Sequence, residues 1–217
     1  SQVKDMLDDY YQVRDNREDI EKERTDEADK VSARITEMLL EKTFSFTPDF
    51  LLRIHQRLFE GIYKHAGAYR TVNISKKEWV LGGDTVMYSS YDMLRETLEY
   101  DFELEKRVDY NALNVDLAIK QICKFISGIW QIHPFREGNT RTTAVFTMKY
   151  LQTFGFTVNN DVFKDNSWYF RNALVRANYK NLPKDIHSTS DYLELFFRNL
   201  ILGEKNVLSN RSMLVLE

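Results

Sequence analysis

Residues 132–142 read IHPFREGNTRT, and this stretch decides how the fold is interpreted. It separates two apolar segments, LAIKQICKFISGIWQI and TTAVFTMKYLQ, which read as buried helices. Pro134 disfavours helical geometry at His133, so the first helix is expected to end there. The second helix is expected to begin at Gly138 or Asn139. The sequence therefore predicts a polar loop held between two apolar helices.

The rest of the chain reads mostly as further helices. Three prolines and eight glycines in 217 residues leave few breaks. Thr47-Pro48 is a good helix start, and the FLLRIHQRLFEGIYKHAG that follows spaces apolar residues as a helix does, as far as about Gly67. One segment departs from this pattern, because WVL, GGD and TVMY at residues 79–88 are typical of a short β-hairpin. We expect an all-α fold with one small hairpin.

The composition restricts the class of protein. A content of 43% hydrophobic and 29% charged residues is typical of a soluble globular domain. The formal net charge of -3 argues against a general nucleic-acid binder. No run approaches the roughly 18–20 apolar residues of a membrane span, and the first residues lack an apolar secretory leader. Cys123 is alone and cannot form an intrachain disulfide. We expect a cytoplasmic protein that binds neither nucleic acid nor membrane.

The loop collects groups that suit a phosphate site. The first N–H groups of the second helix lack partners within the helix and carry the positive end of its dipole, and Gly138 lets an anion approach them closely. Arg141 can add a charge-assisted fork to a phosphate. Glu137 would repel that phosphate unless a cation lies between them, and Mg²⁺ is the natural candidate. A neutral His133 at the lip of the site could take a proton from a hydroxyl.

Each of these residues also has a simpler explanation when it is taken alone. A single histidine at a helix end is more often a cap or a core residue. A single glutamate or arginine in a first turn is more often a surface charge. Their conjunction within the nine residues 133–141 is what favours a functional site.

Two stretches resemble the motifs of the Fic (filamentation induced by cAMP) family. HPFREGNTR is similar to the family signature HPFx(D/E)GN(G/K)R at every position but one. Upstream, residues 67–76 resemble the family's AGxxRxxNIxK stretch, which leads into a flap hairpin. The resemblance implies a Fic-type helical bundle with one β-hairpin flap. It divides the chain into charged N-terminal helices at 1–44, a Fic core at 45–203 and a C-terminal tail at 204–217.

The resemblance also implies an activity, the transfer of AMP from ATP to a Tyr, Thr or Ser hydroxyl of a protein with release of pyrophosphate. Positioning and charge neutralisation are the general means of such transfers. Labelling of the chain's own hydroxyls is also implied. By the same resemblance, His133 is the base, Glu137 holds Mg²⁺, and the phosphates are bound by Gly138, Asn139, Thr140 and Arg141.

Thr140 is the departure from the signature. Most members of the family have glycine there, and a kinase-like branch has lysine. We interpret this position as leaving AMP transfer intact. Two alternatives remain: removal of AMP on the same fold, which usually needs a well-placed inhibitory-type glutamate, and a non-catalytic nucleotide-binding regulator.

The flap is expected to run from about Lys76 to Met87 and to hold the target protein by strand addition at its edge. Lys76, Trp79 and Val80 are the candidates for contact with the target, although Trp79 could equally pack against the core. The residues that fall where the family contacts adenine and ribose have a spacing that also suits core packing: Tyr169, Arg171 and Asn178.

A helix expected at residues 26–42 could be inhibitory. Many Fic proteins carry an (S/T)xxxE(G/N) helix whose glutamate pairs with the last arginine of the signature. Here Ser32 is followed by Thr36 at the fifth position, and Glu37 comes one residue late, which is a rotation of about 100° on a helix. Glu37 could inhibit from this shifted register, the helix could be structural only, or a C-terminal element such as Glu204 could do so. The charged N-terminal helices could also support a homo-oligomer.

Overall fold

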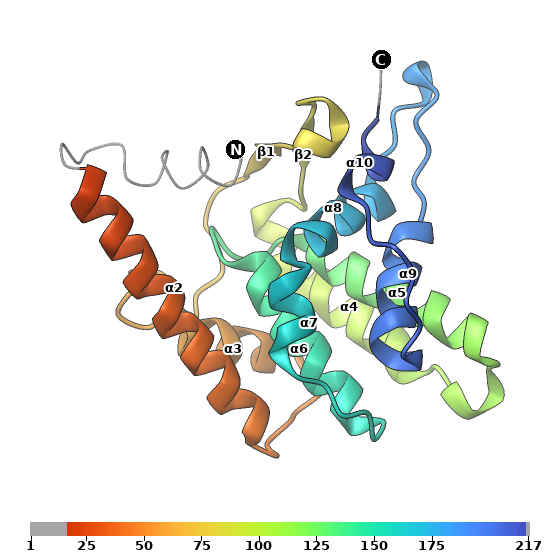
Figure 1. Ribbon diagram of the computed structural model, residues 1–217, viewed down its shortest axis with the longest axis horizontal. Helices are drawn as coiled ribbons and strands as arrows, with labels where there is room; N and C mark the ends of the chain where they lie inside the picture. The colour runs from red at the N-terminus through yellow and green to blue at the C-terminus, as the bar shows by residue number, and fades with distance from the viewer. Residues whose placement is uncertain (1–16, 216–217) are drawn as a thin grey trace.

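The computed structural model describes residues 17–215 as a helical bundle with one two-stranded antiparallel sheet, which confirms the expected fold class (Figure 1). Part of the first N-terminal helix that the charge pattern predicts lies outside these residues. The longer helices are α2 (Arg17–Leu40), α3 (Pro48–Phe59), α4 (Leu94–Lys106), α5 (Val115–Ile132), α6 (Asn139–Thr153), α8 (Ser167–Asn178) and α9 (Asp191–Leu202). Two short helices complete the set, α7 (Asn160–Asp165) and α10 (Asn210–Met213).

Helix α5 organises the bundle, because it packs against α4, α6, α8 and α9. Its apolar residues occur on more than one face, as expected for a helix surrounded by others. Next to it lies a cluster of aromatic rings from α4, α5, α6 and the segment before α3, made of Phe46, Phe102, Phe125, Phe146 and Tyr150. This packing holds α5 and α6 together, and the loop joins the end of one to the start of the other.

Helix α2 lies along one side of the molecule and is tied to the core by side chains that bind helix ends (Figure 1). Arg34 donates to the carbonyls of Leu58 and Glu60, each at 2.9 Å, at the end of α3. The buried Lys149 of α6 donates to the carbonyls of Met38 and Glu41 at 2.8 and 2.7 Å. Cations at helix C-termini are favourable because the last carbonyls lack partners. Within the described residues the helix already runs from Arg17, so it starts before the expected position near residue 26.

Two further element boundaries differ from the sequence prediction. Helix α3 ends at Phe59 and not near Gly67, and Gly61 follows with a φ of 76° that a helix does not allow. The hairpin pairs β1 (Ser75–Lys77) with β2 (Thr85–Met87). The predicted first strand at 79–81 is instead a 3-10 turn, because Val80 and Leu81 turn into the core at 0% and 4% exposure.

The C-terminal residues pack against the core. Helix α10 contacts α8, and Met213 is fully buried. The backbone N–H of Val215 donates to the carbonyl of Val80 at 2.8 Å, which ties the chain end to the 3-10 turn of the hairpin. In the part of the chain described here, no helix combines the length and the apolar character needed to cross a membrane.

Candidate active site

The loop between α5 and α6 starts with an unusual backbone at His133. Its φ and ψ are 52° and 61°, in the left-handed region that non-glycine residues seldom adopt. Its N–H donates to the carbonyl of Trp130 at 3.0 Å, which closes the last turn of α5. The chain therefore reverses sharply at His133, and Pro134 prevents the helix from continuing.

Arg70 holds this reversal in place from the segment before the hairpin. Its side chain is buried, at 4% exposure. It donates to the carbonyls of His133 at 2.7 Å and Ile132 at 3.2 Å, and also to those of Val72 and Ser89. It is therefore a cationic cap on the C-terminus of α5. The sequence motif contains Arg70, but reasoning from the sequence gave it no role because its acceptors are backbone carbonyls far along the chain.

The hydrogen bonds of His133 define its tautomer. Nδ1 lies 2.8 Å from the carbonyl oxygen of Trp130, which can only accept, so Nδ1 carries the proton. Burial, together with the nearby ammonium of Lys76, holds the pKa of His133 well below its usual value. The imidazole is therefore neutral, and Nε2 has a lone pair that can accept a proton.

His133 is completely enclosed in this conformation, at 0% exposure. Tyr88 stacks on its ring with centroids 3.7 Å apart and planes 10° apart, and Trp130 meets it edge-on at 4.9 Å. Lys76 Nζ lies 3.3 Å from Nε2. Because Lys76 and Tyr88 come from β1 and the exit of β2, the hairpin covers the histidine.

Helix α6 begins with an N-terminus suited to an anion. Gly138 is its N-cap, with a φ of 78°, and no side chain caps the helix. A Cβ atom at this position would lie 2.3 Å from Cε2 of Phe59, so a larger residue cannot fit. The side chain of Asn139 turns back to the loop: it accepts from the N–H of Phe135 at 3.0 Å and donates to its carbonyl at 2.7 Å. Asn139 thus shapes the loop, and the first N–H groups of α6 are left for a ligand.

Thr140 and Arg141 point in different directions. The hydroxyl of Thr140 accepts a hydrogen bond from the indole Nε1 of the buried Trp130 at 3.0 Å. This contact joins α6 to α5 and gives a structural reason for threonine at the position that departs from the family signature. Arg141 is exposed, donates to the hydroxyl of Tyr63 at 3.3 Å and lies 4.8 Å from the ring centroid of Phe59. Its guanidinium is therefore accessible to a ligand.

Glu137 has an oxygen that fits a metal ion. Its Oε2 is buried and accepts no hydrogen bond from the described residues, and it lies 3.7 Å from Nε2 of His65. Its backbone carbonyl accepts from Nε2 of His55 at 2.9 Å, and Nδ1 of His55 accepts from the N–H of Gly67 at 2.9 Å. Burial lowers the pKa of His55 to about 4, so His55 is neutral and fixes Glu137 through its backbone. An unsatisfied carboxylate oxygen beside a helix N-terminus suits Mg²⁺.

The hairpin is anchored to α8 by a buried ion pair. Arg171 NH2 lies 2.7 Å from Oε1 of Glu78, with side chains 13% and 2% exposed. Trp79 is half-buried against Trp168, with ring centroids 6.0 Å apart. Val80 is enclosed in the core, so in this conformation Trp79 is the more accessible of the two predicted target contacts. Among the described residues β1 and β2 pair only with each other, so each has an unpaired outer edge.

The residues expected to contact adenine and ribose are only partly gathered near the loop. Arg171 is close enough for its charge to act on His133 and Lys76. The hydroxyl of Tyr169, in contrast, donates to the carbonyl of Tyr192 at 2.7 Å. Asn178 Nδ2 donates to the carbonyls of Ser127 and Leu174 at 3.1 and 3.0 Å. Their nucleotide roles stay predictions.

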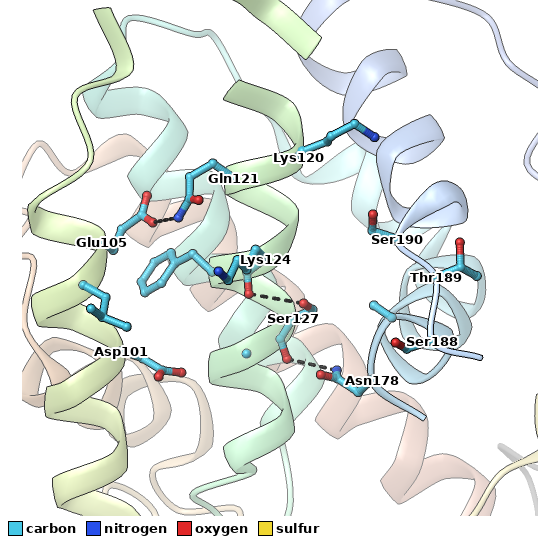
Figure 2. A pocket seen from close by; sticks show the side chains of 14 residues that line it. Asp101, Glu105, Lys120, Gln121, Lys124, Ser127, Asn178, Ser188, Thr189 and Ser190 are labelled. Atoms are coloured by element: carbon cyan, nitrogen blue, oxygen red, sulfur yellow. Dashed lines mark hydrogen bonds between the residues drawn. The ribbon is translucent and has the colours of Figure 1, made fainter. Parts of the chain in front are cut away.

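Asn178 belongs to a separate cleft between α4, α5 and the segment before α9 (Figure 2). The cleft has a volume of about 540 Å³ and polar walls, which include Asp101, Glu105, Lys124 and residues 188–190. None of residues 132–142 lines it. It is therefore distinct from the loop site.

The candidate inhibitory residues of α2 do not approach Arg141 directly. The hydroxyl of Thr36 donates to the carbonyl of Ser32 at 3.2 Å, within the helix. Glu37 is exposed, and its charge acts on Arg57 of α3. The pKa of Tyr63 is raised by burial first, and Glu27 is among the charges that add to this effect. Tyr63 also accepts a hydrogen bond from Arg141, so the charge of Glu27 acts on a direct partner of Arg141.

The site therefore defines a class of domain, a helical bundle in which a hairpin covers a left-handed histidine and a glycine caps the helix that follows. Residues 45–151, just under half of the chain, match the model of the Fic/DOC family. The match covers α3, the hairpin, α4, α5, the loop and most of α6.

Two named relatives are similar over slightly more than half of the chain. The protein adenylyltransferase VbhT of Bartonella schoenbuchensis is 25% identical over 117 residues, which are 54% of this chain and 23% of that protein. The probable protein adenylyltransferase y4lH of Sinorhizobium fredii is 29% identical over 126 residues, which are 57% of this chain and 61% of that protein. The chain thus matches less than two thirds of the length of either relative.

A solved structure supports the same fold. The BepC effector protein of Bartonella tribocorum, with bound AMPPNP, superposes with a TM-score of 0.64 at 17% identity. The superposition covers 83% of this chain and 87% of that one. At this level of identity, the likeness shows the fold.

Proposed function

We propose that this chain is a protein adenylyltransferase that transfers AMP from ATP to a Tyr, Thr or Ser hydroxyl of a protein and releases pyrophosphate. The observation that carries the proposal is the neutral His133, with a basic Nε2, on the loop that leads directly into an uncapped helix N-terminus. Two relatives with named adenylyltransferase activity and a structural neighbour with a bound ATP analogue support it.

The nucleotide phosphates would lie against the first N–H groups of α6, with Arg141 adding a charge-assisted contact. Gly138 contributes through its left-handed φ of 78°, which starts α6, and through the ring of Phe59, which fills the place of a side chain there. The walls of the site are set by fixed groups, so little reorganisation is needed when charge develops on the phosphate.

Glu137 would hold Mg²⁺ through its unsatisfied Oε2, and the ion would supply neutralisation of the phosphate charge. His55 and Asn139 serve this arrangement indirectly. His55 binds the carbonyl of Glu137, and Asn139 fixes Phe135 two residues before it. Both keep the carboxylate at one place beside the helix N-terminus.

In the transfer step, the target hydroxyl oxygen forms a bond to the α-phosphorus of ATP, and the bond from that phosphorus to the bridging oxygen breaks. Pyrophosphate leaves with the electron pair of that bond. The hydroxyl proton goes to Nε2 of His133, and the Nδ1–H bond to the carbonyl of Trp130 stabilises the imidazolium that forms. The target backbone would be held at an open edge of the hairpin.

Intact-mass measurement after incubation with ATP and Mg²⁺ tests this proposal. Wild type is expected to gain the mass of one or more AMP groups, and His133→Ala is expected to lose about 10²- to 10⁴-fold in rate. Glu37→Gly belongs in the same experiment, because a gain over wild type would assign α2 an inhibitory role. Gain of phosphate instead of AMP would overturn the proposal, and equal labelling by wild type and His133→Ala would remove His133 as the base.

A further inference from the structure

The hairpin places a cation on the proton-accepting atom of the site. Lys76 is the middle residue of β1, and its Nζ lies 3.3 Å from Nε2 of His133. The other ring nitrogen is already bound to the carbonyl of Trp130. Since Nε2 has one lone pair, an ammonium that donates to it excludes a target hydroxyl from the same position.

Charged groups from several parts of the site act on the amine of Lys76. The groups that act on it include the cations of Arg171 and Arg70 and the carboxylates of Glu78 and Glu137. The effect of Glu137 is informative, because that residue directly precedes the N-terminus of α6. The amine of Lys76 therefore contacts His133 and is within electrostatic reach of the carboxylate that precedes α6.

The present partner of this ammonium is a neutral nitrogen, which is a modest acceptor for a full charge. Burial, followed by the charge of Arg171, lowers the pKa of Lys76 to about 8, so the amine is charged through most of the neutral range but poorly solvated. A phosphate oxygen would be a better acceptor, because hydrogen bonds between two ionised groups are roughly twice as strong. The flexible four-carbon stem of lysine lets the amine change partners without movement of the strand.

We infer that Lys76 is a nucleotide-responsive positioning residue. Without nucleotide its ammonium occupies Nε2 of His133, and with nucleotide it moves to a phosphate oxygen and leaves Nε2 free for the target hydroxyl. This inference rests on the proposed function, and it assigns Lys76 a role toward the nucleotide in place of contact with the target. The binding of the nucleotide and the freeing of Nε2 of His133 thereby occur together.

The strand need not open for this exchange, because other contacts hold the hairpin. Glu78 is paired with Arg171 at 2.7 Å, and the 3-10 turn is bound to the chain end through Val80 and Val215. Lys77, the next residue, is exposed and on the opposite face of the strand. It has the same side chain on the same strand but faces away from His133, so Lys77→Met is a matched control.

The test is a double-mutant cycle on nucleotide affinity, measured by calorimetry with AMPPNP and Mg²⁺ on the full chain. Lys76→Met is expected to bind about tenfold or more weakly than wild type, since a charge-assisted contact is lost. Lys77→Met is expected to stay within about twofold of wild type, as surface substitutions usually do. His133→Ala is expected to tighten binding when Lys76 is present and to change nothing in Lys76→Met, because only Lys76 gives up the imidazole on binding.

A second readout follows the histidine itself. The ¹⁵N chemical shift of Nε2 of His133 is expected to change when AMPPNP is added to wild type. In Lys76→Met without nucleotide, this shift is expected to equal the value of wild type with AMPPNP bound. The inference alone is overturned if Lys76→Met and wild type bind AMPPNP with equal affinity. It is also overturned if the effects of Lys76→Met and His133→Ala on affinity are additive and the Nε2 shift of nucleotide-free Lys76→Met differs from that of nucleotide-bound wild type. If wild type binds no nucleotide at all, both the inference and the proposed function fail.

Discussion

Replacing Thr140 by valine is expected to destabilise the protein, because its hydroxyl is the acceptor for a buried indole. Nε1 of Trp130 donates to Oγ1 of Thr140 at 3.0 Å, and Trp130 is 0% exposed. Valine keeps the branched shape of threonine and accepts no hydrogen bond. The indole N–H would then be buried without a partner, and water cannot reach it without movement of α5 or α6.

The size of the effect follows from that lost acceptor. A buried donor left unsatisfied costs about 1–3 kcal/mol. For a chain of this length, 1 kcal/mol corresponds to a change in Tm of about 2–4 °C. The free energy of unfolding of Thr140→Val is therefore expected to fall by about 1–3 kcal/mol, and Tm by about 2–12 °C.

Urea denaturation with thermal melting measures both quantities. Thr140→Ser keeps the acceptor oxygen and is expected to retain most of the stability, so it separates the hydrogen bond from the loss of a methyl group. In a Trp130→Phe background the donor is gone, and Thr140→Val is expected to cost much less there. Equal stability of Thr140→Val and Thr140→Ser would refute the view that Thr140 stands at this position to satisfy Trp130.

Four further outcomes are expected. Arg70→Met should lower the free energy of unfolding by at least about 3 kcal/mol, since several carbonyls lose a charged donor. A loss under about 1 kcal/mol in urea titration would contradict the role of Arg70 as a cap on α5. Gly138→Ala should lower the free energy of unfolding by about 2–5 kcal/mol, because alanine is strained at a φ of 78° and its Cβ would overlap the ring of Phe59. An unchanged Tm in thermal melting would show that the loop can shift. The depressed pKa of His55 should lower the free energy of unfolding by about 3 kcal/mol as pH drops from 6.5 to about 4, because the unfolded chain binds the proton first. His55→Gln should weaken this pH dependence. An equal pH dependence in His55→Gln and wild type would exclude His55 as its source. Arg171→Met should speed amide exchange across residues 75–87, because it leaves the buried Glu78 unpaired, and protection equal to wild type would show that the ion pair does not hold the hairpin.

The loop could be predicted from local sequence because its ends are set by local rules. Pro134 ends α5 within two residues, and Gly138 has the left-handed backbone that starts α6. The residues that hold the loop could not be found in this way. Arg70 and His55 reach it from 63 and 82 positions away in the chain, and their acceptors are backbone carbonyls that no side-chain pattern reveals.

The hairpin shows the opposite case, in which a local pattern was misleading. Trp79-Val80-Leu81 before Gly-Gly-Asp resembles a strand before a turn, and a run of three apolar residues cannot distinguish a strand from a buried turn. In the structure Val80 and Leu81 pack into the core, and the strand lies earlier in the chain, at the polar Ser75–Lys77. Tertiary packing decided the register, and it also brought Lys76 to His133.

The contacts around the loop divide its residues into fixed and adjustable groups. The backbone of His133, Phe135 and Glu137 is held from several sides, by Arg70, Asn139 and His55 respectively. Fixed groups of this kind lower the reorganisation needed when charge develops, which is the main requirement for stabilising a transferring phosphoryl group. The long cationic side chains at the site are the ones with weaker or replaceable partners, since Lys76 donates to a neutral ring and Arg141 to a tyrosine hydroxyl. Substitutions of the residues that hold the loop, Arg70, Asn139 and His55, should therefore act first on stability, whereas substitutions of Lys76 and Arg141 should act first on nucleotide affinity.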